Sequence, residues 1–380
     1  MELKPGYKQT EVGAIPEDWE LTTVGDAFEI HNTLRFPISN AVRETMPGPY
    51  PYYGPTSIQG YINEYRVEGE YALIGEDGDH FLKWQTQPMT LLVQGKFNVN
   101  NHAHLVRGTK NLTSWFYYYF SRRDLTPYLT RQGASRYKLT KKKLAALPCA
   151  IPAAVAEQTA VAEALSDADA LIESLDQLIA KKRQIKQGAM QELLTGKRRL
   201  PGFGGEWVIK RLGDVAEISK GQLITESTAI PGDVPVIAGG KKPAYFHNRA
   251  NRTGKTITIS GSGASAGYVA FYESPIFASD CSTIGEGGNY SVEFIYFVLL
   301  LNQEVIYKAQ TGGAQPHIHP DDLRPLMIHV PIDYSEQAAI ATILSDMDAE
   351  IVALESRLAK ARQIKQGMMQ ELLTGRIRLL

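Results

Sequence analysis

Residues 183–196 read RQIKQGAMQELLTG and residues 362–375 read RQIKQGMMQELLTG, so thirteen of fourteen positions are identical at an offset of 179 residues. The match extends upstream without a gap to Glu157 and Glu336, which makes two related segments of forty residues. A match of this length at one constant offset indicates an internal duplication. We therefore expect the chain to contain two copies of one structural unit.

Apolar residues in both copies recur at alternating steps of four and three residues, the spacing typical of a coiled-coil seam. Each copy is expected to form one helix of about 38 residues, beginning after Pro152 or Pro331 and ending at Gly196 or Gly375. The predicted core of the coiled coil contains Leu165, Ile172, Leu175 and Ile179 of the first helix and Leu344, Ile351, Leu354 and Leu358 of the second.

Charge predicts the relative direction of the two helices. Each copy is acidic in its first half and basic in its second half, as Asp169 and Lys186 illustrate in the first copy and Asp348 and Lys365 in the second. Antiparallel packing places acid beside base and opposes the helix dipoles, whereas parallel packing would place like charges together. Exposed ion pairs contribute roughly a few tenths of a kcal/mol each, so they bias the orientation more than they stabilise it. The alternative is that the helices serve two unrelated cores.

A globular region precedes each helix. Both regions open with the pattern W-x5-GD, from Trp19 and from Trp207, and both close on segments that align at the 179-residue offset, whereas their interiors diverge. The expected fold class is α+β, with two globular domains separated by two long helices that form an antiparallel coiled coil, in a pseudo-two-fold internal repeat. The expected boundaries are 1–152, 153–200, 201–330 and 331–380.

Composition limits the function classes. The formal net charge is −1, so a nucleic-acid partner would have to be recognised by local clusters of basic residues. Two cysteines, Cys149 and Cys281, supply neither a disulfide framework nor a zinc site. The longest apolar stretch, residues 292–301, is too short for a membrane span, and the first residues lack the apolar core of a signal peptide, so we expect a cytoplasmic protein.

The divergent interiors contain basic residues mixed with Tyr, Asn and Ser, a composition suited to phosphate neutralisation and to hydrogen bonds with base edges. Residues 131–143 alone carry six Lys or Arg and no acid. The predicted DNA-binding residues are Tyr52, Tyr53, Lys96, Asn98, Asn100, Asn101, Arg136 and Lys138 in the first domain, and Lys241, Lys242, Asn248, Arg249, Ser262 and Ser265 in the second. The alternative is that these are ordinary solvated loops.

Motifs for catalysis are not found. His102 with His104, and His317 with His319, have the spacing of metal ligands but no carboxylate or cysteine close in sequence to complete a site. The stretch GSGASAG from Gly261 is not a dinucleotide-binding motif, and neither an adenine-methyltransferase motif nor a two-metal acidic cluster occurs. We therefore expect a binding protein with no catalytic residues, no metal and no cofactor of its own.

The order of domain, EQ-x-A helix and LLTG, occurring twice, together with GYKQTEVGAIPEDWE, PYYG and NVNNHAH, resembles the specificity subunit of type I restriction-modification systems. The resemblance covers essentially the whole chain. It implies two target recognition domains, each reading one half of a split DNA site in the major groove, with the helices fixing the gap between the half-sites. It also implies two adenine-methyltransferase subunits docked on the helices, and possibly restriction subunits.

In this resemblance, S-adenosylmethionine, ATP and Mg are bound by the partner subunits. The near-identical helix ends would then grip one partner twice, and the predicted partner-binding residues are Lys186, Gln187, Glu192, Lys365, Gln366 and Glu371. Three alternatives remain: a subunit of a related system that cuts on both sides of its site, a duplicated protein-binding scaffold, and an enzyme with an unrecognised site.

Overall fold

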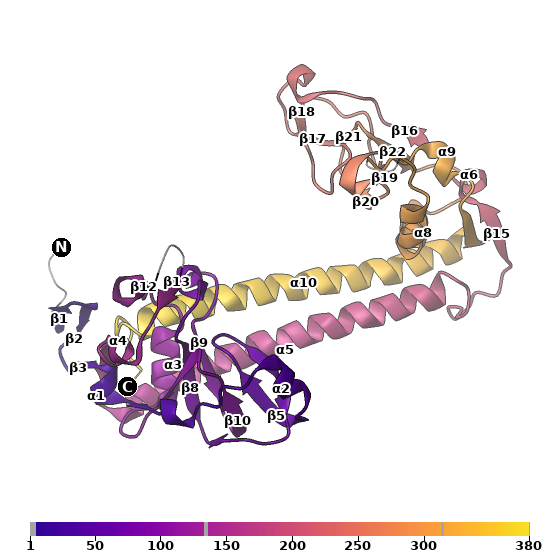
Figure 1. Ribbon diagram of the computed structural model, residues 1–380. Coiled ribbons are helices and arrows are strands. Elements are labelled where there is room, and N and C mark those ends of the chain that lie inside the picture. Colours follow the sequence, from indigo (N-terminus) through magenta and orange to yellow (C-terminus); the bar gives the residue numbers. More distant parts are fainter. Residues whose placement is uncertain (1–4, 133–135, 313–314, 380) are drawn as a thin grey trace. The chain divides into compact units, whose positions relative to one another are not determined.

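The computed structural model describes residues 5–132, 136–312 and 315–379. The chain divides into two compact units, the first formed by Met1–Ser174 with Arg357–Leu380 and the second by Leu175–Ser356. Each unit therefore contains one globular domain, here called a head, and one half of each long helix (Figure 1). Within the described ranges, no helix combines the length and the apolar character that a bilayer crossing requires.

The two long helices are confirmed. Helix α5 spans Val155–Leu193 and helix α10 spans Tyr334–Leu372, 39 residues each. Gly196 and Gly375 follow them, each with a φ of +70°, the left-handed conformation that glycine adopts most readily at the end of a helix. The predicted starts and ends therefore agree with the structure to within a few residues.

The antiparallel direction is confirmed inside each unit. In the first unit Asp169 of α5 pairs with Lys365 of α10, and in the second unit Lys186 of α5 pairs with Asp348 of α10 at 2.5 Å. These two ion pairs are equivalent at the 179-residue offset. Seven of the eight predicted core residues are buried, and Ile172 is half-buried. The alternative of two unrelated helices is therefore excluded.

The first head is built on two sheets. In one, the order is β4 (Glu29–Ile30), β11 (Ala103–Arg107), β8 (Tyr71–Gly75) and β9 (Thr90–Val93), and all neighbours are antiparallel. In the other, the order is β6 (Ile58–Ile62), β5 (Pro47–Tyr53), β10 (Lys96–Val99) and β7 (Val67–Glu68), with β5 and β10 parallel.

The second head repeats this topology, except that its second sheet has three strands and no counterpart of β7 among the described residues. Its antiparallel sheet has the order β16 (Ser219–Lys220), β22 (Cys281–Gly285), β19 (Thr256–Ser260) and β20 (Val269–Tyr272). Its other sheet has the order β18 (Tyr245–His247), β17 (Val234–Ile237) and β21 (Phe277–Ala278), with β17 and β21 parallel. The duplication therefore includes the interiors, where the two sequences have diverged.

Equivalent helices and strands complete each head. The buried helices are α3 (Thr113–Ser121) and α7 (Val292–Leu301). A two-stranded sheet joins β3 (Trp19–Thr23) to β14 (Pro148–Pro152) in the first head, and β15 (Trp207–Arg211) to β23 (Met327–Pro331) in the second. The remaining short elements are β1 (Tyr7–Thr10), β2 (Gly13–Pro16), α1 (Val24–Ala27), α2 (Asn40–Glu44), β12 (Thr130–Gln132), β13 (Arg136–Lys138), α4 (Lys141–Ala145), α6 (Leu212–Val215), α8 (Gln303–Lys308) and α9 (Pro320–Leu323).

The duplicated EQ dipeptide, Glu157–Gln158 in α5 and Glu336–Gln337 in α10, connects the start of each long helix to its head through hydrogen bonds. The carboxylate of Glu336, fully buried, accepts hydrogen bonds from the Arg199 guanidinium at 2.6 and 2.7 Å and from the Trp207 indole at 3.3 Å. Glu157 is held in the same way by Arg378 and Trp19. A buried carboxylate is stable only when it is paired, so the motif and the tryptophan of W-x5-GD form one structural unit.

Candidate nucleic-acid interface

Three segments of the first head meet beyond the carboxyl end of β8. The turn after β8 donates from the Glu76 amide to the His102 carbonyl at 2.7 Å, which joins it to the turn between β10 and β11. The Glu76 carbonyl accepts from the Leu139 amide at 2.7 Å, which joins it to the segment after β13. Strand pairing and these bonds therefore bring together residues that are more than sixty positions apart in the sequence.

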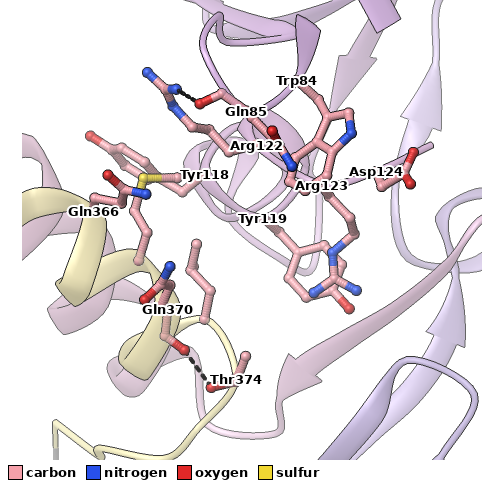
Figure 2. A pocket seen from close by; sticks show the side chains of 12 residues that line it. Trp84, Gln85, Tyr118, Tyr119, Arg122, Arg123, Asp124, Gln366, Gln370 and Thr374 are labelled. Carbon is pink, nitrogen blue, oxygen red and sulfur yellow. Dashed lines mark hydrogen bonds between the residues drawn. The ribbon is translucent and has the colours of Figure 1, made fainter. Parts of the chain in front are cut away.

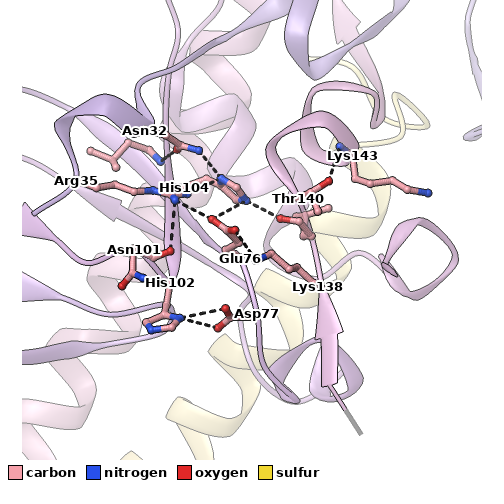
Figure 3. Close-up of polar contacts among 12 residues, drawn as sticks. Asn32, Arg35, Glu76, Asp77, Asn101, His102, His104, Lys138, Thr140 and Lys143 are labelled. Atoms are coloured by element: carbon pink, nitrogen blue, oxygen red, sulfur yellow. Dashed lines mark hydrogen bonds and ion pairs between the residues drawn. The ribbon is translucent and has the colours of Figure 1, made fainter. Parts of the chain in front are cut away.

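A polar network lies behind this junction (Figure 3). The Glu76 carboxylate lies 2.7 Å from Arg35 and 3.1 Å from Lys138. Burial disfavours the charged carboxylate, but the hydrogen bonds from Lys138 and Arg35 outweigh it, so the pKa of Glu76 lies below its ordinary value. The network therefore keeps one anion among two cations, and it orders the two cationic side chains.

His104 is the neutral member of the network. Its Nδ1 atom lies 2.9 Å from the side-chain nitrogen of Asn32 and 2.7 Å from the guanidinium of Arg35, and both of these groups are donors. Its Nε2 atom lies 2.6 Å from the backbone carbonyl of Leu139. These partners assign the tautomer with hydrogen on Nε2. Burial lowers the pKa of His104 to about 4, with a further contribution from the charge of Arg35. His104 is therefore a structural residue.

His102 faces the opposite way and is half exposed. Its Nδ1 atom lies 2.9 Å from the carboxylate of Asp77 (Figure 3). His102 and His104 thus have separate partners, and the two imidazoles do not converge on one point. Within the described ranges, no group of three or more His, Cys, Asp or Glu side chains is arranged to hold a metal ion.

The second head has the same junction with different side chains. The Gly261 amide donates to the Asp280 carbonyl at 3.0 Å, and the Gly261 carbonyl accepts from the Ile318 amide at 3.0 Å. The Ser262 hydroxyl donates to the carboxylate of Asp280. Gly261, at the position of Glu76, has no side chain, and a Cβ atom there would lie 2.8 Å from that carboxylate. The acid–base network is therefore specific to the first head.

Three predicted DNA-binding residues are buried and fully used inside the first head. Tyr52 donates to the Phe36 carbonyl at 2.6 Å, Asn98 donates to the Glu64 carbonyl at 2.7 Å, and Asn100 accepts from the His102 amide at 2.8 Å. Because their polar atoms hold loops in place, we withdraw the prediction that these three side chains contact bases.

The other predicted residues of the first head are dispersed. Asn101 and Lys138 lie at the junction described above, with Asn101 exposed and Lys138 half-buried. Lys96 lies at the opposite end of β10, over the ring of Tyr65 at 4.6 Å. Tyr53 is half-buried against Phe97. The side chain of Arg136 lies outside the described part of the chain.

The predicted residues of the second head lie in two neighbouring loops and at the end of β18. Lys241 and Lys242 are exposed in the β17–β18 loop, and the Lys241 ammonium lies 5.4 Å from the ring of Tyr268. Ser262 and Ser265, both half-buried, belong to the loop between β19 and β20. The Ser260 hydroxyl donates to the Gly240 carbonyl at 3.4 Å, which places the two loops side by side. The structure also places Asn248 and Arg249, both exposed, directly after β18.

Sequence reasoning missed Arg35, Glu76, Asp77 and Asp280. The 179-residue offset already aligned Lys138 with His317, and both residues form equivalent bridges, to Asp77 and to Ser262. The strand-to-glycine turn in GEYALIGEDG, residues 69–78, contains Glu76 and Asp77, but Arg35 and Asp280 lie outside this turn and its counterpart GKTITISGSG, residues 254–263.

The predicted partner-binding residues divide into two groups. Lys186 and Lys365 form ion pairs with Asp348 and Asp169 of the other helix, and contact of these lysines with a partner stays a prediction. Gln187 and Gln366 are exposed, and the carboxylates of Glu192 and Glu371 form local ion pairs with Arg198 and Arg376. The ion pairs of the two lysines confirm the predicted pairing of acid with base between antiparallel helices.

Gln366 borders the cavity of the first unit shown in Figure 2, which has a volume of about 570 Å³. The Arg123 guanidinium lies 3.8 Å from the centre of the Tyr119 ring, and Arg122 donates to the Gln85 carbonyl at 2.6 Å. The lining residues are Trp84, Gln85, Tyr118, Tyr119, Arg122, Arg123, Asp124, Gln366, Met369, Gln370, Leu373 and Thr374. The cavity therefore joins the end of α3 to the repeated end of α10.

Comparisons with known proteins agree with this architecture. The type I restriction modification DNA specificity domain matches residues 16–184 and again residues 204–365. A putative type I restriction enzyme specificity subunit of Haemophilus influenzae is 27% identical over 353 residues, which are 87% of each chain. A type I restriction enzyme specificity subunit of Methanocaldococcus jannaschii is 22% identical, over 98% of this chain and 96% of the relative.

A solved structure shows the same fold. The crystal structure of the S subunit of a type I restriction-modification system from M. genitalium matches with a TM-score of 0.72 and 16% identity, over 98% of both chains. The two domain matches together span most of this chain, and each begins in one head and ends in the long helix that follows it. The chain therefore belongs to the family of type I restriction-modification DNA specificity subunits.

Proposed function

We propose that this chain reads a bipartite DNA target, with one half-site contacted by each head, and that it carries two adenine-methyltransferase subunits on its helices. The observation that carries the proposal is the repeated topology of the heads combined with different side chains at equivalent strand ends. One frame with two sets of polar side chains suits two unrelated half-sites on the same duplex. The methylation chemistry, with S-adenosylmethionine, ATP and Mg, would belong to partner subunits in the cytoplasm, and this chain would be non-catalytic.

The exposed ends of the helices support the docking of one partner twice. Gln187 and Gln366 are exposed and identical in the two copies, as are Gln191 and Gln370. Packing of the coiled coil does not require identity at exposed positions, whereas two copies of one partner would. The cavity beside Gln366 and Gln370 gives such a partner a concave contact in the first unit.

The test is a genome-wide map of methylated adenines in cells that carry this chain and its methyltransferase partner. We expect a motif of two specified half-sites separated by unspecified bases. A contiguous motif would contradict the bipartite proposal. Deletion of seven residues from both helices, about 10 Å of helix and about three base pairs, should change the spacer or abolish methylation. Methylation with the original spacer would show that the helices do not set it.

Binding to DNA should also depend on salt. Because contacts to phosphates release counterions, the affinity of the assembled complex for its target should fall steeply as salt is raised. A complex with the methyltransferase that binds no DNA even at low salt would favour the alternative of a protein-binding scaffold.

A further inference from the structure

The junction beyond β8 and β19 is built on three equivalent backbone hydrogen bonds in the two heads. Two of these are described above. In one, the backbone amide of Glu76 or Gly261 donates, and in the other, the backbone carbonyl of the same residue accepts. The third joins the Gly78 amide to the Tyr137 carbonyl at 3.2 Å in the first head, and the Gly263 amide to the Pro316 carbonyl at 3.0 Å in the second. The backbone frame is therefore the same, although the loops that follow β8 and β19 differ in length.

Three positions of this frame carry polar side chains in both heads. In the first head they are Asp77, His102 and Lys138. In the second head the equivalent positions hold Ser262, Asp280 and His317. In each head a side-chain hydrogen bond joins the first position to the second. The carboxylate of this pair is at the first position in the first head, as Asp77, and at the second position in the second head, as Asp280. We call these three positions the junction triad.

The triad is not required by the hydrophobic core. The side chains of Asp77 and His102 are 37% and 50% exposed, and an ion pair this accessible adds little to stability. Lys138 is half-buried, as are Ser262, Asp280 and His317. Residues that differ in chemistry on an unchanged frame, and that remain accessible, are suited to ligand discrimination.

We propose that the junction triad of each head contacts base edges in the major groove and sets the difference between the two half-sites. This inference rests on the proposed function, since it assigns residues to the reading of DNA. Lys138 offers donors that suit the O6 and N7 atoms of guanine, and His102, whose Nδ1 atom is held by Asp77, keeps its Nε2 atom available for a base edge. Asp280 offers an acceptor that suits the exocyclic amino group of cytosine. The first head should therefore depend on a guanine and the second on an amino-bearing base.

The test uses the full chain with its methyltransferase partner and the map of methylated adenines. His102→Gln should reduce the preference at one position of one half-site by roughly 5- to 150-fold and leave the other half-site unchanged. Asp280→Asn should do the same in the other half-site. His329→Gln and Glu304→Gln make the same chemical changes at exposed positions of the second head outside the triad, and both half-sites should stay unchanged.

If His102→Gln abolishes methylation, the double change Asp77→Ser with His102→Asp tests the same claim. It installs the Ser–Asp pair that the frame already holds in the second head, and the first half-site should change. An unchanged motif in these variants would overturn the inference while the bipartite function stands. A uniform loss at all sites from a folded complex would assign the triad to positioning or to phosphates, and would also overturn it. A wild-type complex without a bipartite motif would instead refute the proposed function.

Discussion

Replacement of the buried glutamine of each EQ dipeptide should destabilise the head to which it is attached. Gln337 accepts from the Ser291 amide at 2.9 Å and donates to the Pro331 carbonyl at 2.9 Å, and it is almost fully buried. Gln337→Ala leaves both backbone groups without a partner. Each unsatisfied buried group costs about 1 to 3 kcal/mol, so the two groups together should lower the free energy of unfolding by about 2 to 6 kcal/mol.

Gln158 has an equivalent place with one more hydrogen bond. It accepts from the Leu112 amide at 3.1 Å and donates to the Pro152 carbonyl and the Asn111 side chain, both at 3.0 Å. Leu112 and Ser291 are the residues that precede the buried helices α3 and α7. Gln158→Ala should therefore loosen the start of α3, and Gln337→Ala the start of α7.

Unfolding in urea, followed by circular dichroism, measures the loss, and amide hydrogen exchange locates it. The matched controls are Gln184→Ala and Gln363→Ala, which remove exposed glutamines from the same two helices and should change stability by less than about 0.5 kcal/mol. Faster exchange should occur at the start of α7 in Gln337→Ala and at the start of α3 in Gln158→Ala. Stability losses equal to those of the controls would refute the role assigned to the EQ dipeptide.

Three further predictions concern pH, charge and backbone conformation. The pKa of His104 is about 4 in the folded chain and 6.5 ordinarily, so the unfolded chain binds the proton first as the pH falls. The free energy of unfolding should therefore fall by up to about 3 kcal/mol between pH 6.5 and pH 4. Urea titrations should show a smaller fall in His104→Gln. Lys142→Ala with Lys143→Ala, both exposed at α4, should weaken binding to all DNA sequences alike and reduce the salt dependence; loss of sequence preference alone would contradict phosphate contact. Gly188 lies within α5 with open space around it, so Gly188→Ala should stabilise the protein by about 0.5 to 1 kcal/mol. Gly375→Ala should destabilise the protein, because the Cβ atom would lie 2.4 Å from Pro16. Equal melting temperatures of the two variants would contradict both expectations.

The residues predicted to bind DNA could not be identified reliably from the sequence. Tyr52, Asn98 and Asn100 have the same chemistry as residues that read bases, but their hydrogen bonds go to the backbone of their own head. An amide or phenol group serves either purpose, and the sequence does not show which partners surround it. Asp77 and Asp280 were missed because the partner of each, His102 or Ser262, lies in a different turn or loop that is distant in the sequence.

The duplication, the two long helices and their antiparallel direction follow from the amino-acid sequence alone. These features depend on local properties: the spacing of apolar residues, the glycine that follows each helix, and the change from acidic to basic along each copy. Two other features become visible in the folded chain alone: why glutamate and glutamine recur as a pair, and which three segments meet beyond β8 and β19. Those contacts join residues that are distant along the chain, and sheet pairing and burial, which no single segment encodes, choose their partners.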